Sequence, residues 1–268
     1  MWRHLIIATK HPLTQINEAP RRPGYRWLEK GEPCEMRTTD LSRLRRSRLL
    51  AELPPADLAT MLAGCFVQAL PEGAVLCRQG ERARFLHVVV SGRVGLFGES
   101  ADREALVEIF GPGDAFIVPA VMLDAPYLLT ARLLDEGRVL MWPAAAFRAD
   151  VRANVSLALG AAMQLSGYWR TLVSQIKDLK LLAATDRLSA LLFALAPRTP
   201  GPATVTLPGG RRLVAGWLGV TPQSLSRAFA ALRPLGVSGG GRQVTIANPA
   251  RLRRRAAIVA RSTAKDRP

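Results

Sequence analysis

Polar side chains able to bind bases and phosphates follow one another in the stretch TPQSLSR, residues 221–227. A glutamine amide can pair with adenine, an arginine fork can pair with guanine, and hydroxyl groups suit phosphates. We therefore expect this stretch to supply contacts with double-stranded DNA, made by Thr221, Gln223, Ser224, Ser226 and Arg227. The alternative is an ordinary hairpin of two surface helices, since short patterns of this kind also arise by chance.

Residues 211–232 predict two short helices that would present these side chains. Gly219 falls where the chain needs a left-handed residue between the helices, and Ala215 is small enough to let them cross closely. Thr221 is expected to cap the second helix, and Pro222 suits its first turn. Apolar residues at three-and-four spacing predict its buried face, which consists of Leu225, Ala228, Phe229 and Leu232.

A glycine-rich turn follows in the stretch GVSGGGRQVTIA, residues 236–247. We expect a strand at 243–246, a second strand at 204–207, and a wing whose tip carries Arg242 toward a phosphate. Residues 181–255 are thus predicted to form a winged helix-turn-helix domain. The basic tail at 256–268 either contacts DNA or stays solvated.

Composition supports an anionic partner. The 268 residues include 37 Lys and Arg against 21 Asp and Glu, a formal charge of +16, and 49% are hydrophobic. Such a charge favours polyanions, although abundant arginine can also reflect only a GC-rich genome. Because no apolar run is long enough to cross a bilayer and no secretory signal begins the chain, we expect a cytoplasmic protein with no membrane partner.

Short strands punctuated by glycine recur from about Leu70 to Leu140, and a short helix is expected around Leu58 and Leu62. We expect residues 41–150 to form a domain built on an antiparallel roll. The preceding residues 1–40 predict a flexible extension, and Met36 is an alternative start of the native chain. The pattern contains no catalytic constellation, so we expect no enzyme activity. His87, inside a strand pattern, is expected to be a hydrogen-bonded structural histidine rather than a ligand.

The cysteines do not form a metal motif. Cys34, Cys65 and Cys77 are widely spaced, which argues against a zinc site, an iron-sulfur cluster and a disulfide framework. We expect buried or incidental thiols.

A long helix is predicted at residues 151–180, where apolar residues alternate in steps of four and three from Val151 to Leu179. So strict a seam suits pairing with an identical helix, and the alternative is a helix buried within its own domain. We therefore expect a homodimer whose seam consists of Val155, Ala158, Ala162, Leu165, Trp169, Leu172 and Ile176.

Together, the stretches LPEGAVLCRQGERARFLHVVVSGRVGLF, GPGDAF and LVAGWLGVTPQSLSRAFAALRPLGV, with the long helix, resemble a family of bacterial transcription factors. This is the CRP/FNR superfamily, named after the cyclic-AMP receptor protein and the fumarate-nitrate reductase regulator. The resemblance covers residues from about 45 to 255. It implies an α+β fold in which an N-terminal, cyclic-nucleotide-binding-like roll senses an effector, a long helix dimerises, and a winged helix-turn-helix reads a palindromic operator. It also implies RNA polymerase as a partner and base contacts by Gln223, Ser226 and Arg227.

The effector is expected to differ from cyclic AMP. Relatives that bind it carry a glycine-glutamate pair and, about ten residues later, an arginine-serine pair, but here Pro119, Ala120 and the stretch 128–130 occupy these places. A buried cyclic phosphate would then lack charged partners. The expected pocket is apolar and consists of Phe116, Val121, Met122, Leu123 and Leu128. In this it is similar to family members that are proposed to use haem, or to members that need no ligand. A regulatory module that binds a cyclic nucleotide is the alternative function.

Overall fold

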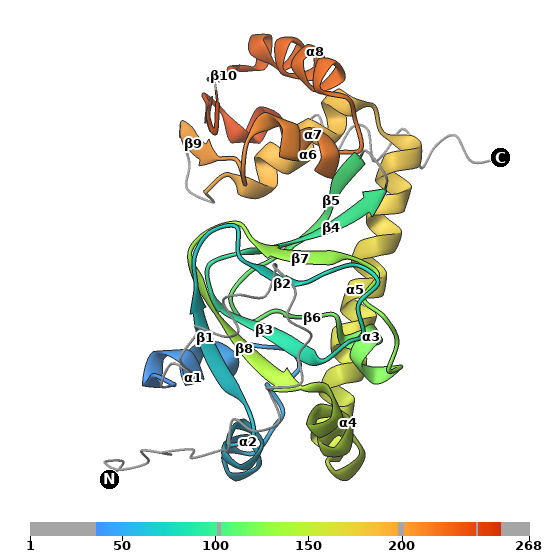
Figure 1. Cartoon of the computed structure of the whole chain (residues 1–268). Coiled ribbons are helices and arrows are strands. Elements are labelled where there is room, and N and C mark those ends of the chain that lie inside the picture. The colour runs from blue at the N-terminus through green and yellow to red at the C-terminus, as the bar shows by residue number, and fades with distance from the viewer. Residues whose placement is uncertain (1–35, 101–102, 198–200, 240, 253–268) are drawn as a thin grey trace, which may run out of the picture. The chain divides into compact units, whose positions relative to one another are not determined.

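The computed structural model describes residues 36–100, 103–197, 201–239 and 241–252 (Figure 1). They form two compact units: one holds the residues up to 97 and 109–167, and the other holds 98–108 and the residues from 168 onward. One helix, α5 (Val155–Leu181), contributes to both. Most of the expected extension at 1–40 and all of the expected tail at 256–268 lie outside the described residues.

Two four-stranded sheets make up the roll. The first sheet has the order β1 (Phe66–Leu70), β8 (Gly137–Pro143), β3 (Phe85–Ser91), β6 (Ala115–Phe116). The second has the order β2 (Val75–Cys77), β7 (Thr130–Leu133), β4 (Val94–Ser100), β5 (Arg103–Phe110). The pairs β1–β8, β8–β3, β3–β6, β2–β7 and β7–β4 are antiparallel, which confirms the predicted antiparallel roll.

The outer face of the first sheet packs on helix α4 (Ala144–Ala153). Trp142 of β8 is fully buried, its ring meets the edge of Phe147 at 5.2 Å between centroids, and its Nε1 donates to Asp150 at 3.0 Å. Because successive residues of a strand point to opposite faces, Met141 and its cross-strand neighbours face the interior of the roll.

Aromatic rings line that interior. His87 pairs with Met141 in the register of β3 and β8, and Met141 pairs with Phe66 of β1, so these side chains share one face. Phe116 stacks on His87 at 5.3 Å and on Phe110, from the second sheet, at 5.4 Å. The rings therefore join the two sheets across the core.

Three further helices border the roll, namely α1 (Thr38–Leu44), α2 (Pro55–Leu62) and α3 (Val118–Met122). Helix α1 begins inside the range expected to be a flexible extension. It is ordered there because the buried carboxylate of Asp40 accepts from Arg138 of β8 at 2.6 Å and from the backbone N–H of Arg37 at 3.0 Å.

The long helix begins later than the sequence predicted. Val151 belongs to α4, and α5 starts only at Val155, because Asn154 between them has an extended backbone. The Asn154 side chain accepts from the N–H of Leu157 at 3.0 Å and donates to Asp57 of α2 at 2.8 Å. Asn154 thus ends one helix and caps the next.

The first turns of α5 lie close to the chain before α2. Leu157, Gly160, Ala161 and Gln164 are buried on one side of the helix. A Cβ at Gly160 would overlap the backbone carbonyl of Leu49, so only glycine permits this close approach.

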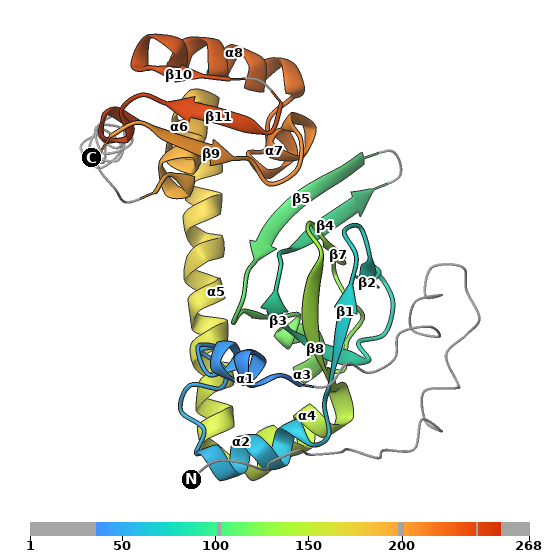
Figure 2. The same cartoon turned by 90° about the vertical axis from the view of Figure 1, so that its left-hand side faces the viewer.

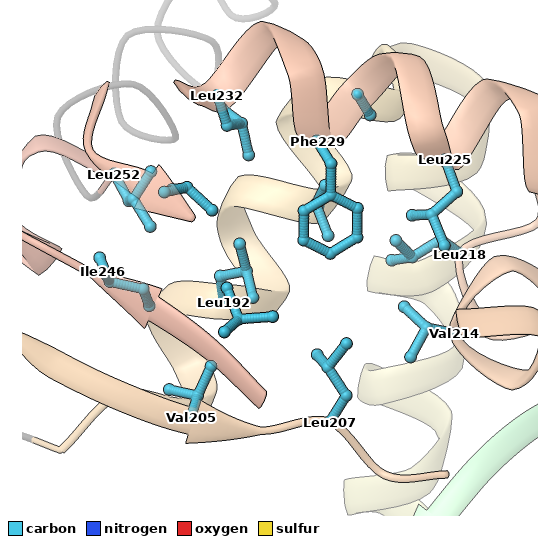
Figure 3. Close-up of a cluster of buried hydrophobic side chains, with 14 of the residues drawn as sticks. Leu192, Val205, Leu207, Val214, Leu218, Leu225, Phe229, Leu232, Ile246 and Leu252 are labelled. Atoms are coloured by element: carbon cyan, nitrogen blue, oxygen red, sulfur yellow. The ribbon is translucent and has the colours of Figure 1, made fainter. Parts of the chain in front are cut away.

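Helices and a small sheet make up the rest of the second unit. The helices are α6 (Ala184–Leu195), α7 (Arg211–Trp217), α8 (Pro222–Leu232) and a short 3₁₀ turn at Arg233–Leu235. The strands β10 (Val237–Ser238), β11 (Gln243–Ile246) and β9 (Ala203–Thr206) lie side by side in that order (Figure 2). One apolar core joins helices and sheet, and its centre includes Leu192, Val205, Val214 and Phe229 (Figure 3).

Candidate nucleic-acid interface

Helices α7 and α8 form the predicted helix-turn-helix. Gly219 has a left-handed backbone with φ +62°, and Thr221 Oγ1 accepts from the N–H of Ser224 at 3.1 Å, which confirms the predicted turn and cap. Pro222 is the first residue of α8, as expected. Ala215, on the facing side of α7, is buried in the same core.

The two faces of α8 differ as its periodicity predicted. Leu225, Ala228, Phe229 and Leu232 point into the core (Figure 3). Gln223, Ser226 and Arg227 are exposed, and Ser224 is half-buried. The candidate base-contacting residues therefore occupy the outer side of α8, toward its N-terminal end.

A chain of hydrogen bonds links three of these residues. The Thr221 hydroxyl lies 3.0 Å from the Ser224 hydroxyl, and Arg227 Nη2 donates to Ser224 Oγ at 3.3 Å. Ser224 therefore orients Arg227 within the free protein, a role that the sequence pattern did not predict. The spacing of three residues on one helix is the signal that could have shown it.

The wing is a hairpin of β10 and β11, with β9 pairing on the other side of β11. Its turn contains Gly239 at φ +122° and Gly241 at φ +64°, and Arg242 is exposed at the end of the turn. The strand expected at 204–207 forms one residue earlier, and Leu207 N–H donates to the carbonyl oxygen of Arg242 at 2.7 Å. This bond ties the end of the wing turn to the residue that follows β9.

The charge of this part of the chain has one sign. No Asp or Glu stands between Asp186 and Asp266, whereas arginines recur throughout. Arg212, Arg227, Arg233 and Arg242 are exposed. This run makes the helix-turn-helix unit a far better partner for phosphates than the total charge of +16 indicates. The charge of the whole chain did not show where the positive residues are concentrated.

Most of the predicted dimerisation seam lies on an exposed side of α5, away from its buried residues. Val155 is 85% exposed, Trp169 69% and Ile176 52%, while Ala162 and Leu172 are also exposed. Ala158 and Leu165 are half-buried. Leu159, Met163 and Val173, which the seam prediction did not include, are exposed beside it and widen the apolar stripe.

The five residues of the expected effector pocket differ in exposure. Phe116 and Val121 are fully buried and Met122 is half-buried, but Leu123 and Leu128 are 76% and 83% exposed. The five residues therefore do not share one environment, and the effector pocket stays a prediction.

A surface turn explains the exposure of the two leucines. Asp124 has φ +50°, and its carboxylate accepts from Arg82 at 2.8 Å and from Arg148 at 3.2 Å. These ion pairs fix the turn at the surface. Tyr127 is the buried residue of this segment, and its hydroxyl accepts from the N–H of Arg84 at 3.0 Å.

Two segments of the roll lack the charged partners that a cyclic nucleotide needs. The segment of α3 and the stretch 128–130 carry no charged side chain, and Thr130 Oγ1 already accepts from the N–H of Gln79 at 3.1 Å. A buried cyclic phosphate would lack a charge-assisted hydrogen bond there. The residues present therefore do not fit this group.

His87 is not the hydrogen-bonded histidine that was expected. It is fully buried, and neither ring nitrogen has a hydrogen-bond partner among the described residues. Burial lowers the pKa of its imidazole from 6.5 to about 3, so the ring is neutral at physiological pH.

The two described cysteines are buried, as predicted, and Cys34 lies outside the described residues. Burial raises the pKa of the Cys65 thiol and raises that of Cys77 to about 12, which keeps both protonated.

In the described ranges there is no group of three or more side chains placed to hold a metal ion, and no helix that is long and apolar enough to cross a membrane.

Comparisons with known proteins agree with this arrangement. The sequence matches the family "Cyclic nucleotide-binding domain" over residues 67–154 and the family "Crp-like helix-turn-helix domain" over residues 186–255. It is 24% identical to the "CRP-like cAMP-activated global transcriptional regulator" of Mycobacterium tuberculosis, over 80% of this chain and 98% of the relative.

Solved structures include two similar chains. A putative cyclic nucleotide binding protein from Ruegeria pomeroyi is 30% identical, with a TM-score of 0.60 over 82% of this chain and 97% of the other. FixK2 from Bradyrhizobium japonicum is 21% identical, with a TM-score of 0.62 over 71% of this chain and 96% of the other, and shares the fold.

Acid should destabilise the protein through His87. Because the folded pKa of about 3 lies below the unfolded value of 6.5, the unfolded state binds the proton first, and stability falls as pH drops from 6.5 toward 3. Replacing His87 with leucine should remove about 2 kcal/mol of the loss in unfolding free energy between pH 6.5 and about pH 4.5. Urea unfolding at a series of pH values measures it, and equal acid slopes for the two proteins would contradict the neutral, unpaired imidazole.

Proposed function

Because this chain belongs to the CRP/FNR family of DNA-binding transcriptional regulators, we propose that it works as a homodimer that reads a palindromic operator under the control of its roll. Proteins of this family are transcription regulators rather than enzymes. Promoter activity would then depend on contact with RNA polymerase, a partner that the family resemblance implies.

The observation that carries the proposal is the outer face of α8. Gln223 and Arg227 project from a capped helix in a stretch without acidic residues, and Ser224 orients Arg227. Gln223, Ser226 and Arg227 would contact base edges in the major groove, while Thr221, Ser224 and Arg242 would lie near phosphates. Base contacts would supply the sequence preference and phosphate contacts most of the affinity.

The homodimer is supported by the apolar stripe of α5. Large exposed side chains such as Val155, Trp169 and Ile176 recur at heptad spacing on a single helix face. A second copy of the same helix presents the same stripe, so a two-fold axis lets each seam cover the other. Two reading helices related by this axis suit an operator with two-fold symmetry.

The effector is proposed to differ from cyclic AMP. The mycobacterial relative is described as cAMP-activated, but the corresponding stretches of this roll carry no charged side chain. Haem, or no ligand at all, stays the prediction for the effector, and it rests on the family resemblance.

Cyclic AMP should therefore produce no saturable heat when titrated into the protein in a calorimeter. The reason is that α3 and the stretch 128–130 offer the cyclic phosphate no charged side chain. Saturable binding would instead support the alternative function, a regulatory module that binds a cyclic nucleotide.

Replacing Arg227 with alanine should cost about 1–3 kcal/mol at a preferred duplex and relax the base preference at one position of each half-site. The reason is the loss of a bidentate contact with a base. Arg233→Ala, which removes the same charge at the other end of α8, is the matched control and should leave the base preference unchanged. Footprinting and anisotropy on duplexes with single base changes measure both effects. An unaltered base preference in Arg227→Ala would show that Arg227 does not contact a base.

Trp169→Glu should convert the protein to a monomer, because it places a charge in the apolar seam of each helix. Ser174→Glu is the control, since Ser174 is exposed and shares the heptad position of the buried Gly160, away from the seam, and should leave the mass unchanged. Light scattering coupled to size exclusion gives the mass in solution. A dimer that survives in Trp169→Glu would refute the seam.

A further inference from the structure

One arginine bridges three parts of the helix-turn-helix unit. Arg211 begins α7, and its guanidinium carbon lies 4.2 Å from the centroid of the Phe229 ring of α8. Its Nη2 donates to the carbonyl oxygen of Gly239, in the turn of the wing, at 3.1 Å. The Arg211 side chain thus connects α7, to which it belongs, with α8 and with the turn of the wing.

The start of the wing turn is held less firmly than its strand β11. That strand pairs with β9 through four residue pairs, and Leu207 N–H holds the carbonyl oxygen of Arg242, but β10 pairs with β11 through only two, Val237 with Ile246 and Ser238 with Thr245. The turn between them has the sequence Gly-Gly-Gly-Arg, and glycine is the residue that loses the most backbone entropy when it is fixed. A Cβ at Gly239 would come within 2.5 Å of the carbonyl oxygen of Gln243, so a side chain at this position cannot stiffen the turn.

Arginine is the side chain that suits this position. A planar guanidinium stacks on an aromatic ring with its face while its edge donates hydrogen bonds, whereas a lysine ammonium is a compact point charge on a flexible stem. Because Phe229 belongs to the buried core, the ring gives the guanidinium a fixed platform. The hydrogen bond from Arg211 then fixes the position of the Gly239 carbonyl group relative to α8.

We propose that Arg211 is a positioning residue for DNA binding, which holds the wing, and with it Arg242, in place relative to α8 before DNA arrives. A wing that is already ordered avoids the entropy cost of ordering it on the duplex. This inference rests on the proposed contact between Arg242 and the DNA backbone. The other reading of Arg211 is a direct phosphate contact, in which only its charge matters.

Binding to a mixed-sequence duplex of about 40 base pairs at low salt separates the two readings, because such binding depends on backbone contacts. Arg211→Lys keeps the charge, yet it should weaken binding about as much as Arg242→Ala does, roughly 5- to 10-fold, and the double variant should bind no worse than either single one. Arg212→Lys, at the exposed next position, is the matched control and should bind as the wild type does. Wild-type affinity of Arg211→Lys, with the full effect of Arg242→Ala retained in its background, would overturn the proposal.

A second measurement uses the free protein. The backbone amides of Gly239 and Gly241 should show lower NMR order parameters in Arg211→Lys than in the wild type, while the amides of α8 keep theirs. Unchanged order in the turn would overturn the proposal, whatever the DNA result. If the turn loosens but Arg242→Ala binds DNA as the wild type does, Arg211 still positions the wing, and it is the proposed contact of Arg242 that fails.

Discussion

The proposed function of this protein depends on one constraint, the apolar stripe on α5. Helix α5 buries Leu157, Gly160 and Ala161 on one side, and on the other it leaves Val155, Trp169 and Ile176 in water. Exposed apolar surface in a strict heptad register is costly unless a matching surface covers it. A second copy of α5 would cover it and would set two α8 helices in a fixed relation, which is what a symmetric operator requires.

In the helix-turn-helix unit, different features serve affinity for DNA and preference for a base sequence. Its run without acidic residues, from Asp186 to Asp266, attracts the phosphate backbone of any sequence. Discrimination requires side chains held in one geometry, and the bonds from Thr221 and Arg227 to the Ser224 hydroxyl hold one such arrangement in the free protein. The position of Arg211 between Phe229 and Gly239 extends the same principle to the wing. Preorganisation of this kind reduces the entropy lost on binding.

Local rules predicted much of this arrangement from the sequence. The left-handed turn at Gly219, the cap at Thr221 and the buried face of α8 follow from short-range preferences and from helical periodicity. Features that depend on distant partners were missed. The break at Asn154 depends on Asp57, 97 residues away, and the exposure of Leu123 and Leu128 follows from the pairing of Asp124 with Arg82 and Arg148. The sequence could not show that His87 lacks a hydrogen-bond partner. A strand pattern indicates which face of the sheet a residue lies on, but not which groups it contacts.

Selection of bound duplexes from a random DNA pool tests the central claim most directly, because it reports sequence preference and symmetry together. Two copies of α8 related by a two-fold axis predict an enriched palindrome whose half-sites are centred about one helical turn apart, roughly 34 Å. Enrichment of a single asymmetric site, or no enrichment at moderate salt, would contradict the account.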